Sequence, residues 1–364
     1  MLRKISLSLV ILVCSLSAFA QADSTKKAMD TSKPAAPPAP AVIITGSADL
    51  YYRYAFNKVN FGPTSFTQTH DQFQLGMATV KLEHKTTKMD MVADLGFGPR
   101  AQTFDYTEQN GVNGGGILQA VKQLYISYSP NSVVKFTGGT WATHIGYEVM
   151  DAYGNRNYSM SYMFTNGPFS HTGVRADFTF GKSGFMIGVA NPTDWRTVPN
   201  AYQNNKNMIA QYSWLPSDNF HIYLNYVGGR DTGDNKVHQY DVVINAKVNS
   251  MFGIGANGTY NHSSPHTDYT VSHNWYGAAI YLNLDPAPWF GLTLREEYFS
   301  DKDAVKTPGG NVIASTLSAN FKVDNFIFIP EFRLDAANNP WFPKNDGTQS
   351  KSDPSFLLAA VYSF

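Results

Sequence analysis

The chain ends in the stretch PSFLLAAVYSF, Pro354–Phe364, in which larger and smaller side chains alternate. Every second residue from Phe356 to Phe364 is apolar or aromatic, and the positions between them are smaller on average. A period of two is typical of a β-strand, and about ten residues is the length that a tilted strand needs to cross a bilayer. A strand of a soluble β-sandwich fits this stretch equally well, so the rest of the chain must decide.

The composition favours a membrane interface and argues against a nucleic-acid partner. Of the 364 residues, 43% are hydrophobic and 14% aromatic, and the formal net charge is zero. Tyrosine is favoured where one end of a ring is apolar and the other is wet, as at a membrane interface. A neutral chain lacks the basic surface that nucleic acids require, and any pore in it is expected to have a weak, locally set ion preference.

Residues 1–20 have the features of a secretory signal peptide. A basic pair precedes an apolar run, and a small-x-small cleavage site ends at Ala20. The only cysteine, Cys14, lies in this segment, and Val13 before it lacks the small side chain of a lipoprotein signal. We therefore expect an exported mature chain that has no disulfide bonds.

Residues 21–43 are polar and then rich in proline and alanine, as in KPAAPPAPA. Such a segment cannot bury a core, so we expect an extended periplasmic linker, or else a tether to peptidoglycan or a periplasmic partner. No later stretch has 18 uninterrupted apolar residues, so no transmembrane helix is predicted. A membrane location would then require a closed β-barrel, which satisfies every backbone polar group.

Strand-like alternation recurs sixteen times in residues 44–364. One of these segments, 70–85, changes parity midway, which predicts a β-bulge near Ala78 or Thr79. The sixteen segments are 44–56, 70–85, 89–97, 118–128, 133–143, 171–181, 184–191, 207–214, 219–227, 237–248, 252–262, 274–284, 289–300, 311–321, 326–335 and 354–364.

The connections between these segments decide the fold class. Eight long connections alternate strictly with seven short ones, and the longest covers residues 144–170. A soluble sandwich has no reason to sort its loops, whereas an outer-membrane barrel has long outer loops and short periplasmic turns. We predict an all-β fold, a single transmembrane antiparallel up-and-down β-barrel of about 16 strands, with 14 or 18 as alternatives. Sixteen strands leave an aqueous channel.

Strand parity separates side chains that face lipid from those that face the lumen. A cation at mid-bilayer costs ~2–4 kcal/mol on the lipid face, so charged residues are expected to point inward. They would form either a charge ladder that sets solute preference, or ion pairs that solvate and stiffen the wall. Glu296 breaks the parity and is expected near the outer rim. The predicted pore-lining residues are Asp49, Arg53, Asp90, Asp94, Arg175, Asp177, Arg295, Glu297, Glu331, Arg333 and Asp335.

The sequence gives little sign of catalysis or of a cofactor. Paired carboxylates would suit a hydrolase, but the histidines are scattered and neither G-x-S-x-G nor H-E-x-x-H occurs. The glycine-rich pieces 113–117 and 137–141 lack the lysine of a phosphate-binding loop. His262, His266 and His273 share one outer connection and could bind metal. We nevertheless predict no enzyme, no metal and no cofactor.

Several stretches, taken in order, resemble the putative beta-barrel porin-2 family, also called OmpL-like. They are ITGSADLYYRY, GYEVMDAYGNRNYSMSYMF followed by PFSHTG, LREEYFSD, DNFIFIPEFRLD and the terminal AAVYSF. The resemblance spans nearly the whole chain after the linker. It implies a porin-like protein of the outer membrane and supplies no catalytic residue. The terminal Phe364 resembles the signal that the barrel-insertion machinery reads in outer-membrane barrels.

The connection 144–170 is a candidate constriction loop. In general porins the third outer loop commonly folds into the lumen, which here would place Glu148, Asp151 and Arg156 at a constriction. The alternative is an outward loop that covers the mouth. General porins are usually trimers, so a homo-oligomer is a further expectation, although no stretch of the sequence marks a subunit interface.

The expected function is that of a porin in the outer membrane of a Gram-negative bacterium. Its water-filled channel would pass small hydrophilic solutes or ions by passive diffusion with weak selectivity, and its partners would be outer-membrane lipid and the insertion machinery. One alternative is a structural or adhesive barrel without an open pore, which acts through its linker or loops. Another is a soluble exported β-protein that binds glycans. In a barrel, residues 354–364 should pair antiparallel with residues 44–56.

Overall fold

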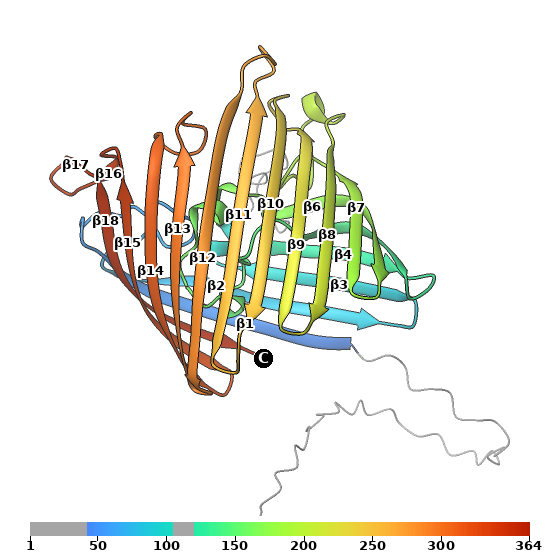
Figure 1. Cartoon of the computed structure of the whole chain (residues 1–364), viewed down its shortest axis with the longest axis horizontal. Helices are drawn as coiled ribbons and strands as arrows, with labels where there is room; N and C mark the ends of the chain where they lie inside the picture. The colour runs from blue at the N-terminus through green and yellow to red at the C-terminus, as the bar shows by residue number, and fades with distance from the viewer. Residues whose placement is uncertain (1–41, 105–119) are drawn as a thin grey trace, which may run out of the picture. The chain divides into compact units, whose positions relative to one another are not determined.

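The computed structural model describes residues 42–104 and 120–364, and the strands in these ranges close into a barrel (Figure 1). Sixteen strands follow one another around the wall, and each pairs antiparallel with its neighbours. The prediction of a single antiparallel barrel of about 16 strands is therefore confirmed. Within the described ranges no helix is long and apolar enough to cross a membrane. The predicted signal peptide, most of the predicted linker and the glycine-rich piece 113–117 lie outside the described residues.

The barrel strands are longer than most strands of soluble proteins, as a tilted membrane-crossing strand requires. Their bounds are β1 Val42–Ala55, β2 Gln72–Lys85, β3 Met89–Phe97, β4 Val121–Tyr128, β5 Val134–Ala142, β6 Ser170–Phe180, β7 Ser183–Ala190, β8 Asn207–Ser217, β9 Phe220–Arg230, β10 Lys236–Lys247, β11 Phe252–Ser264, β12 His273–Ala287, β13 Phe290–Asp301, β14 Gly310–Val323, β15 Phe326–Ala337 and β18 Ser352–Ser363.

Short elements occupy the connections. Helix α1 (Pro99–Phe104) follows β3, and the 3-10 turn η2 (Ala152–Gly154) and helix α3 (Tyr162–Asn166) lie between β5 and β6. Another 3-10 turn, η3 (Asn200–Tyr202), lies between β7 and β8, and the two-residue strands β16 (Phe342–Pro343) and β17 (Gln349–Ser350) pair with each other between β15 and β18.

The seam between β1 and β18 closes the barrel as predicted. The register runs antiparallel from Ser47 opposite Ser363 to Ala55 opposite Ser355. Beyond the Ser47–Ser363 pair, Phe364 N donates to Gly46 O at 2.9 Å, and Phe364 O accepts from Gly46 N at 3.0 Å. Strand β1 begins at Val42, so residues 42 and 43 belong to the sheet rather than to the linker.

A β-bulge interrupts the pairing of β1 with β2. Asp49 faces both Gly76 and Met77, because the register shifts between Ala48 and Leu50. The bulge was expected near Ala78 or Thr79, so the prediction was right in kind and displaced along the strand. A Cβ atom on Gly76 would lie 1.7 Å from Oδ2 of Asp49, while Oδ1 of Asp49 accepts a hydrogen bond from Met77 N at 3.1 Å. Only glycine leaves room for this carboxylate.

The connections sort by length as the sequence predicted. Those after β2, β6, β8, β12 and β14 have two or three residues, whereas those after β1, β5, β7 and β15 are much longer. The connection between β9 and β10 is the exception at the outer end, because both strands extend until only residues 231–235 remain. The C-terminus lies at the short-turn end, where Ser363 N donates to Asn325 O at 3.1 Å (Figure 1).

Candidate functional site

The connection between β5 and β6, residues 143–169, enters the barrel and is called here the lumen loop. Nε2 of His144 lies 3.0 Å from the carbonyl oxygen of Tyr226 on β9, and Gly146 N donates to Asp241 on β10 at 3.0 Å. Farther along, the side chain of Asn157 donates to Ser318 on β14 at 2.7 Å. These wall residues lie on different sides of the barrel, so the lumen loop crosses the lumen instead of covering the mouth.

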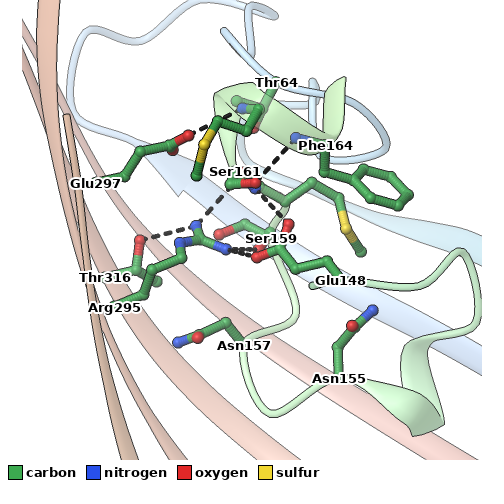
Figure 2. Close-up of polar contacts among 12 residues, drawn as sticks. Thr64, Glu148, Asn155, Asn157, Ser159, Ser161, Phe164, Arg295, Glu297 and Thr316 are labelled. Carbon is green, nitrogen blue, oxygen red and sulfur yellow. Dashed lines mark hydrogen bonds and ion pairs between the residues drawn. The ribbon is translucent and has the colours of Figure 1, made fainter. Parts of the chain in front are cut away.

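Arg295 on β13 is the centre of one anchor of the loop (Figure 2). Its guanidinium lies 2.5 Å from Glu148 and donates to the carbonyl oxygen of Ser159 at 2.7 Å and to Thr316 at 3.0 Å. The side chain of Arg295 is fully buried. A buried ion pair of this kind depends on additional hydrogen bonds, and here the Ser159 carbonyl group of the loop and the Thr316 hydroxyl group of the wall supply two of them.

Two wall carboxylates hold the backbone N–H groups of the loop. Glu331 accepts from Tyr158 N at 2.7 Å and from Ser159 N at 3.1 Å. Glu297 accepts from the N–H groups of Tyr162 and Met163 at 2.8 and 2.9 Å. These bonds give buried backbone donors the partners that they must have away from water.

Arginine side chains hold the carbonyl groups of the same stretch. Arg333 donates to Met160 O at 2.6 Å and forms an ion pair with Asp335 at 2.8 Å. Together with the bond from Arg295 to Ser159 O, this contact completes a pattern in which wall carboxylates bind N–H groups and wall guanidiniums bind C=O groups. The stretch is thus fixed by side chains rather than by a backbone ladder.

A second set of anchors lies on the β1–β4 side. Lys122 lies 3.1 Å from Asp94 and 2.7 Å from Asp151 of the loop. Arg100 donates to Met150 O at 3.1 Å, and its guanidinium lies over the ring of Tyr158 at 4.9 Å. Burial raises the pKa of Tyr158 well above its usual range, so this phenol stays protonated and donates to the carboxylate of Asp49 at 2.5 Å.

All three residues proposed for a constriction are paired with the wall. Glu148 pairs with Arg295, Asp151 with Lys122, and Arg156 with Asp285 of β12 at 2.8 Å. The lumen loop therefore carries its charged side chains as anchors. Burial also lowers the pKa of His144, at the start of the loop, to about 4, so this ring is neutral near pH 7.

The predicted pore-lining residues all lie on the inner face, but they fall into two groups. Arg175 and Asp177 remain open to the lumen, with side chains 21% and 28% exposed, and Asp90 is half-buried. The other group is buried and holds loops; in it Arg53, for example, pairs with Asp353 at 3.2 Å. The buried residues are Asp49, Arg53, Asp94, Arg295, Glu297, Glu331, Arg333 and Asp335.

The expectation for Glu296 was wrong. This residue lies midway along β13, faces outward opposite Ile280, and accepts a hydrogen bond from the Ser315 hydroxyl at 2.6 Å. Arg295 and Glu297, on either side of Glu296 in the strand, both point inward, so the alternation of the strand places Glu296 outward.

Sequence reasoning missed several anchoring residues. Lys122 was not predicted to face inward because a register shift between Asp94 and Leu95 changes the inside–outside alternation of β4. Arg100 lies on the short helix α1, beyond the strand pattern. Asp353 and Asp285 do follow the alternation of β18 and β12, so period-two counting could have found them.

The lumen loop leaves space on both of its sides. A cavity of about 850 Å³, called here the outer cavity, lies among the outer ends of β8 to β12 and the neighbouring loops. A second cavity of about 250 Å³ lies between the loop residues 147–157 and the wall residues Asn245, Tyr281 and Asn283. Among residues 42–104 and 120–364, no three His, Cys, Asp or Glu side chains are placed to hold a metal ion, and His262 instead lies 2.9 Å from Asn274.

A family model described as putative beta-barrel porin-2, OmpL-like, matches residues 41–364. The chain belongs to this family. Membership and the barrel fold identify it as a porin-like β-barrel of the bacterial outer membrane. A comparison with curated proteins gives no match.

Solved structures of outer-membrane barrels resemble this family member in fold. The outer membrane channel DcaP of Acinetobacter baumannii has a TM-score of 0.60 at 13% identity, with 90% of this chain and 99% of that chain covered. An anion-selective porin from Comamonas acidovorans has a TM-score of 0.60 at 9% identity, with coverages of 89% and 99%. The trimer form of OmpT from Vibrio cholerae has a TM-score of 0.59 at 11% identity, with coverages of 90% and 100%.

Proposed function

We propose that this porin-like barrel is a water-filled channel for the passive diffusion of small hydrophilic solutes or ions. The observation that carries the proposal is a sixteen-strand barrel whose lumen is only partly filled, with cavities of about 850 and 250 Å³ beside the lumen loop. Barrels of this strand number enclose aqueous channels. The structures of similar fold include an outer membrane channel and an anion-selective porin, which supports the same role here.

The arrangement of charges supports weak selectivity. Four of the partly exposed lumen charges form pairs of opposite sign, Arg175 with Asp177 at 3.3 Å and Lys81 with Glu83 at 2.8 Å. The buried charges pair with one another, as Arg53 does with Asp353, or bind the lumen loop, as Arg295 does through Glu148. Paired charges produce little field at a distance, so neither ion sign is strongly favoured.

Planar-bilayer recording of the purified barrel tests this proposal. Discrete conductance steps in KCl are expected, and protein unfolded by heat before addition serves as the control. A detergent-folded barrel that produces no steps would favour the alternative, a structural or adhesive barrel that acts through its linker or loops.

Export, assembly and oligomeric state form part of the proposal. Residues 1–20 are proposed as the signal peptide, and the C-terminal strand as the element that the insertion machinery recognises. We also propose a homo-oligomer, because the outward Glu296 is costly against lipid and a subunit contact would cover it. Mass measurement of the barrel in detergent checks this, and a monomeric mass at all protein concentrations would contradict it.

A further inference from the structure

The outer cavity is lined largely by uncharged polar side chains. Five amides reach it from different elements: Asn166 at the end of α3, Asn207 on β8, Asn235 before β10, Gln239 on β10 and Asn261 on β11. Gln239 and Asn261 are cross-strand partners, and their side-chain amides lie 3.5 Å apart. An amide both donates and accepts hydrogen bonds, as a hydroxyl group does.

Three carboxylates also line the outer cavity, but each accepts a hydrogen bond from at least one backbone N–H group. Asp194 accepts from Phe169 N at 2.7 Å and Ser170 N at 2.8 Å, and Asp231 accepts from Gly233 N at 2.7 Å. Asp303 accepts from Asn274 N at 2.7 Å. Carboxylates that hold loop backbone in this way are poorly placed to bind a solute cation.

The outer cavity also has the size and the aromatic wall of a ligand site. Its volume of about 850 Å³ lies within the ~300–1,000 Å³ typical of ligand pockets. The half-buried ring of Trp195 lines it beside the amides. An indole ring offers an apolar face for the C–H groups of a solute and an N–H group for its oxygens.

We propose that the outer cavity binds neutral polyhydroxylated solutes, meaning linear oligosaccharides, before they pass the lumen loop. Alternating C–H and O–H groups match a wall that combines amides with one indole. The charged side chains on this wall are three carboxylates that accept hydrogen bonds from backbone N–H groups and one lysine, Lys306, so an acidic solute meets more negative than positive charge. As a statement about the transported solute, the inference rests on the proposed channel function.

Single-channel recording with maltohexaose tests the inference on the unmodified protein. Maltohexaose added on the side of the outer loops should interrupt the current in a saturable, concentration-dependent way. Poly(ethylene glycol) of similar hydrodynamic size lacks the hydroxyl groups and should reduce the current without saturation. An oligogalacturonate of equal length, which carries carboxylates, should bind at least roughly tenfold more weakly.

A substitution pair locates the site. Gln239→Leu with Asn261→Leu should weaken the maltohexaose block roughly tenfold while the conductance in KCl stays within about twofold. The matched control is Gln203→Leu, which removes an exposed amide of an outer loop that does not line the cavity. Should the double variant fail to fold, the comparison of maltohexaose with poly(ethylene glycol) on the unmodified protein still decides.

Tryptophan fluorescence separates failure of the site from failure of the channel. Titration of the detergent-folded barrel with maltohexaose should change its emission, and the Trp195→Phe variant should lose that change. A barrel that binds maltohexaose but does not conduct would overturn the channel and keep the site. A conducting barrel that responds alike to maltohexaose and poly(ethylene glycol), with no fluorescence change, would overturn the oligosaccharide inference.

Discussion

At the scale of single residues, the lumen depends on pairing between wall side chains and loop backbone. In the loop stretch from Tyr158 to Met163, four N–H groups are bound by Glu331 and Glu297, and two C=O groups are bound by Arg295 and Arg333. The charged side chains of β13 and β15 therefore fix the backbone of a loop segment that has no regular hydrogen-bond ladder of its own. Burial of these charges is tolerated because each of the four meets a partner of opposite charge or a polar group of the backbone.

Arg295→Gln should free the loop stretch from one of its anchors on the barrel wall. Removal of one partner of a buried ion pair costs ~3–5 kcal/mol because the remaining charge is uncompensated. We expect a lower melting temperature in detergent and a noisier single-channel current. Combining it with Glu148→Gln should recover part of the lost stability.

Arg230→Gln is the control for this variant, because Arg230 is exposed at the outer end of β9. A melting temperature and current trace for Arg295→Gln that match those of the control would show that the anchor does not hold the loop.

Gly76→Ala should destabilise the barrel by ~1–3 kcal/mol, the usual cost of overpacking. The new methyl group would displace the Asp49 carboxylate and break its bonds to Met77 and Tyr158. Gly253→Ala is the matched control, because its Cβ atom would find its nearest neighbour at 3.5 Å. Equal unfolding free energies for the two variants, followed by circular dichroism, would contradict this account of the bulge.

At the scale of elements, the lumen loop crosses the barrel interior and is the expected constriction of the proposed channel. Deletion of residues 151–164 removes two of its ion pairs and most of the segment that crosses the lumen. We expect the single-channel conductance to rise severalfold, because the cross-section for ions widens.

Deletion of residues 267–270, an exposed part of the loop between β11 and β12, is the control and should leave the conductance near its original value. An unchanged conductance after the larger deletion would mean that the ions take a path that the loop does not narrow.

Phe364 directly follows strand β18 and extends its pairing with β1. Removal of Phe364 deletes the last two hydrogen bonds to Gly46 and the terminal ring. We expect much less folded barrel in the outer membrane, and Phe364→Tyr, which keeps a ring, should assemble normally. Refolding into detergent micelles separates the two causes: an equal defect there would show that the ring stabilises the barrel and is not read as a signal.

At the scale of the whole molecule, selectivity should be weak and easily shifted. The chain has zero formal net charge, and four of the open lumen charges form two pairs of opposite sign. The reversal potential in a KCl gradient should be small. Arg175→Gln leaves Asp177 without its partner and should shift the preference toward cations, more strongly at low salt, where screening is weaker.

Lys302→Gln is the control, since it removes an exposed positive charge from the loop after β13. A strong preference in the unmodified channel, or an equal shift in both variants, would contradict a preference set locally by the paired charges.

The sequence by itself determined the barrel. Period-two alternation and loop length are local properties, so they predicted the strand number, the seam between β1 and β18 and the inward orientation of Arg295 and Glu297. Counting by twos along one strand mispredicted two positions. The bulge at Gly76 and the changed alternation at Lys122 depend on the pairing with the neighbouring strand.

Only the tertiary structure decided which inward charges face water. The lumen loop is anchored by contacts between residues far apart in the chain, such as Arg295 and Glu148, which are separated by 147 positions. No local pattern records such a pair. Burial under the loop makes most of the predicted pore-lining charges into anchors, because a charge removed from water is stable only when it has a partner. The outer cavity is therefore lined largely by uncharged polar side chains, amides among them.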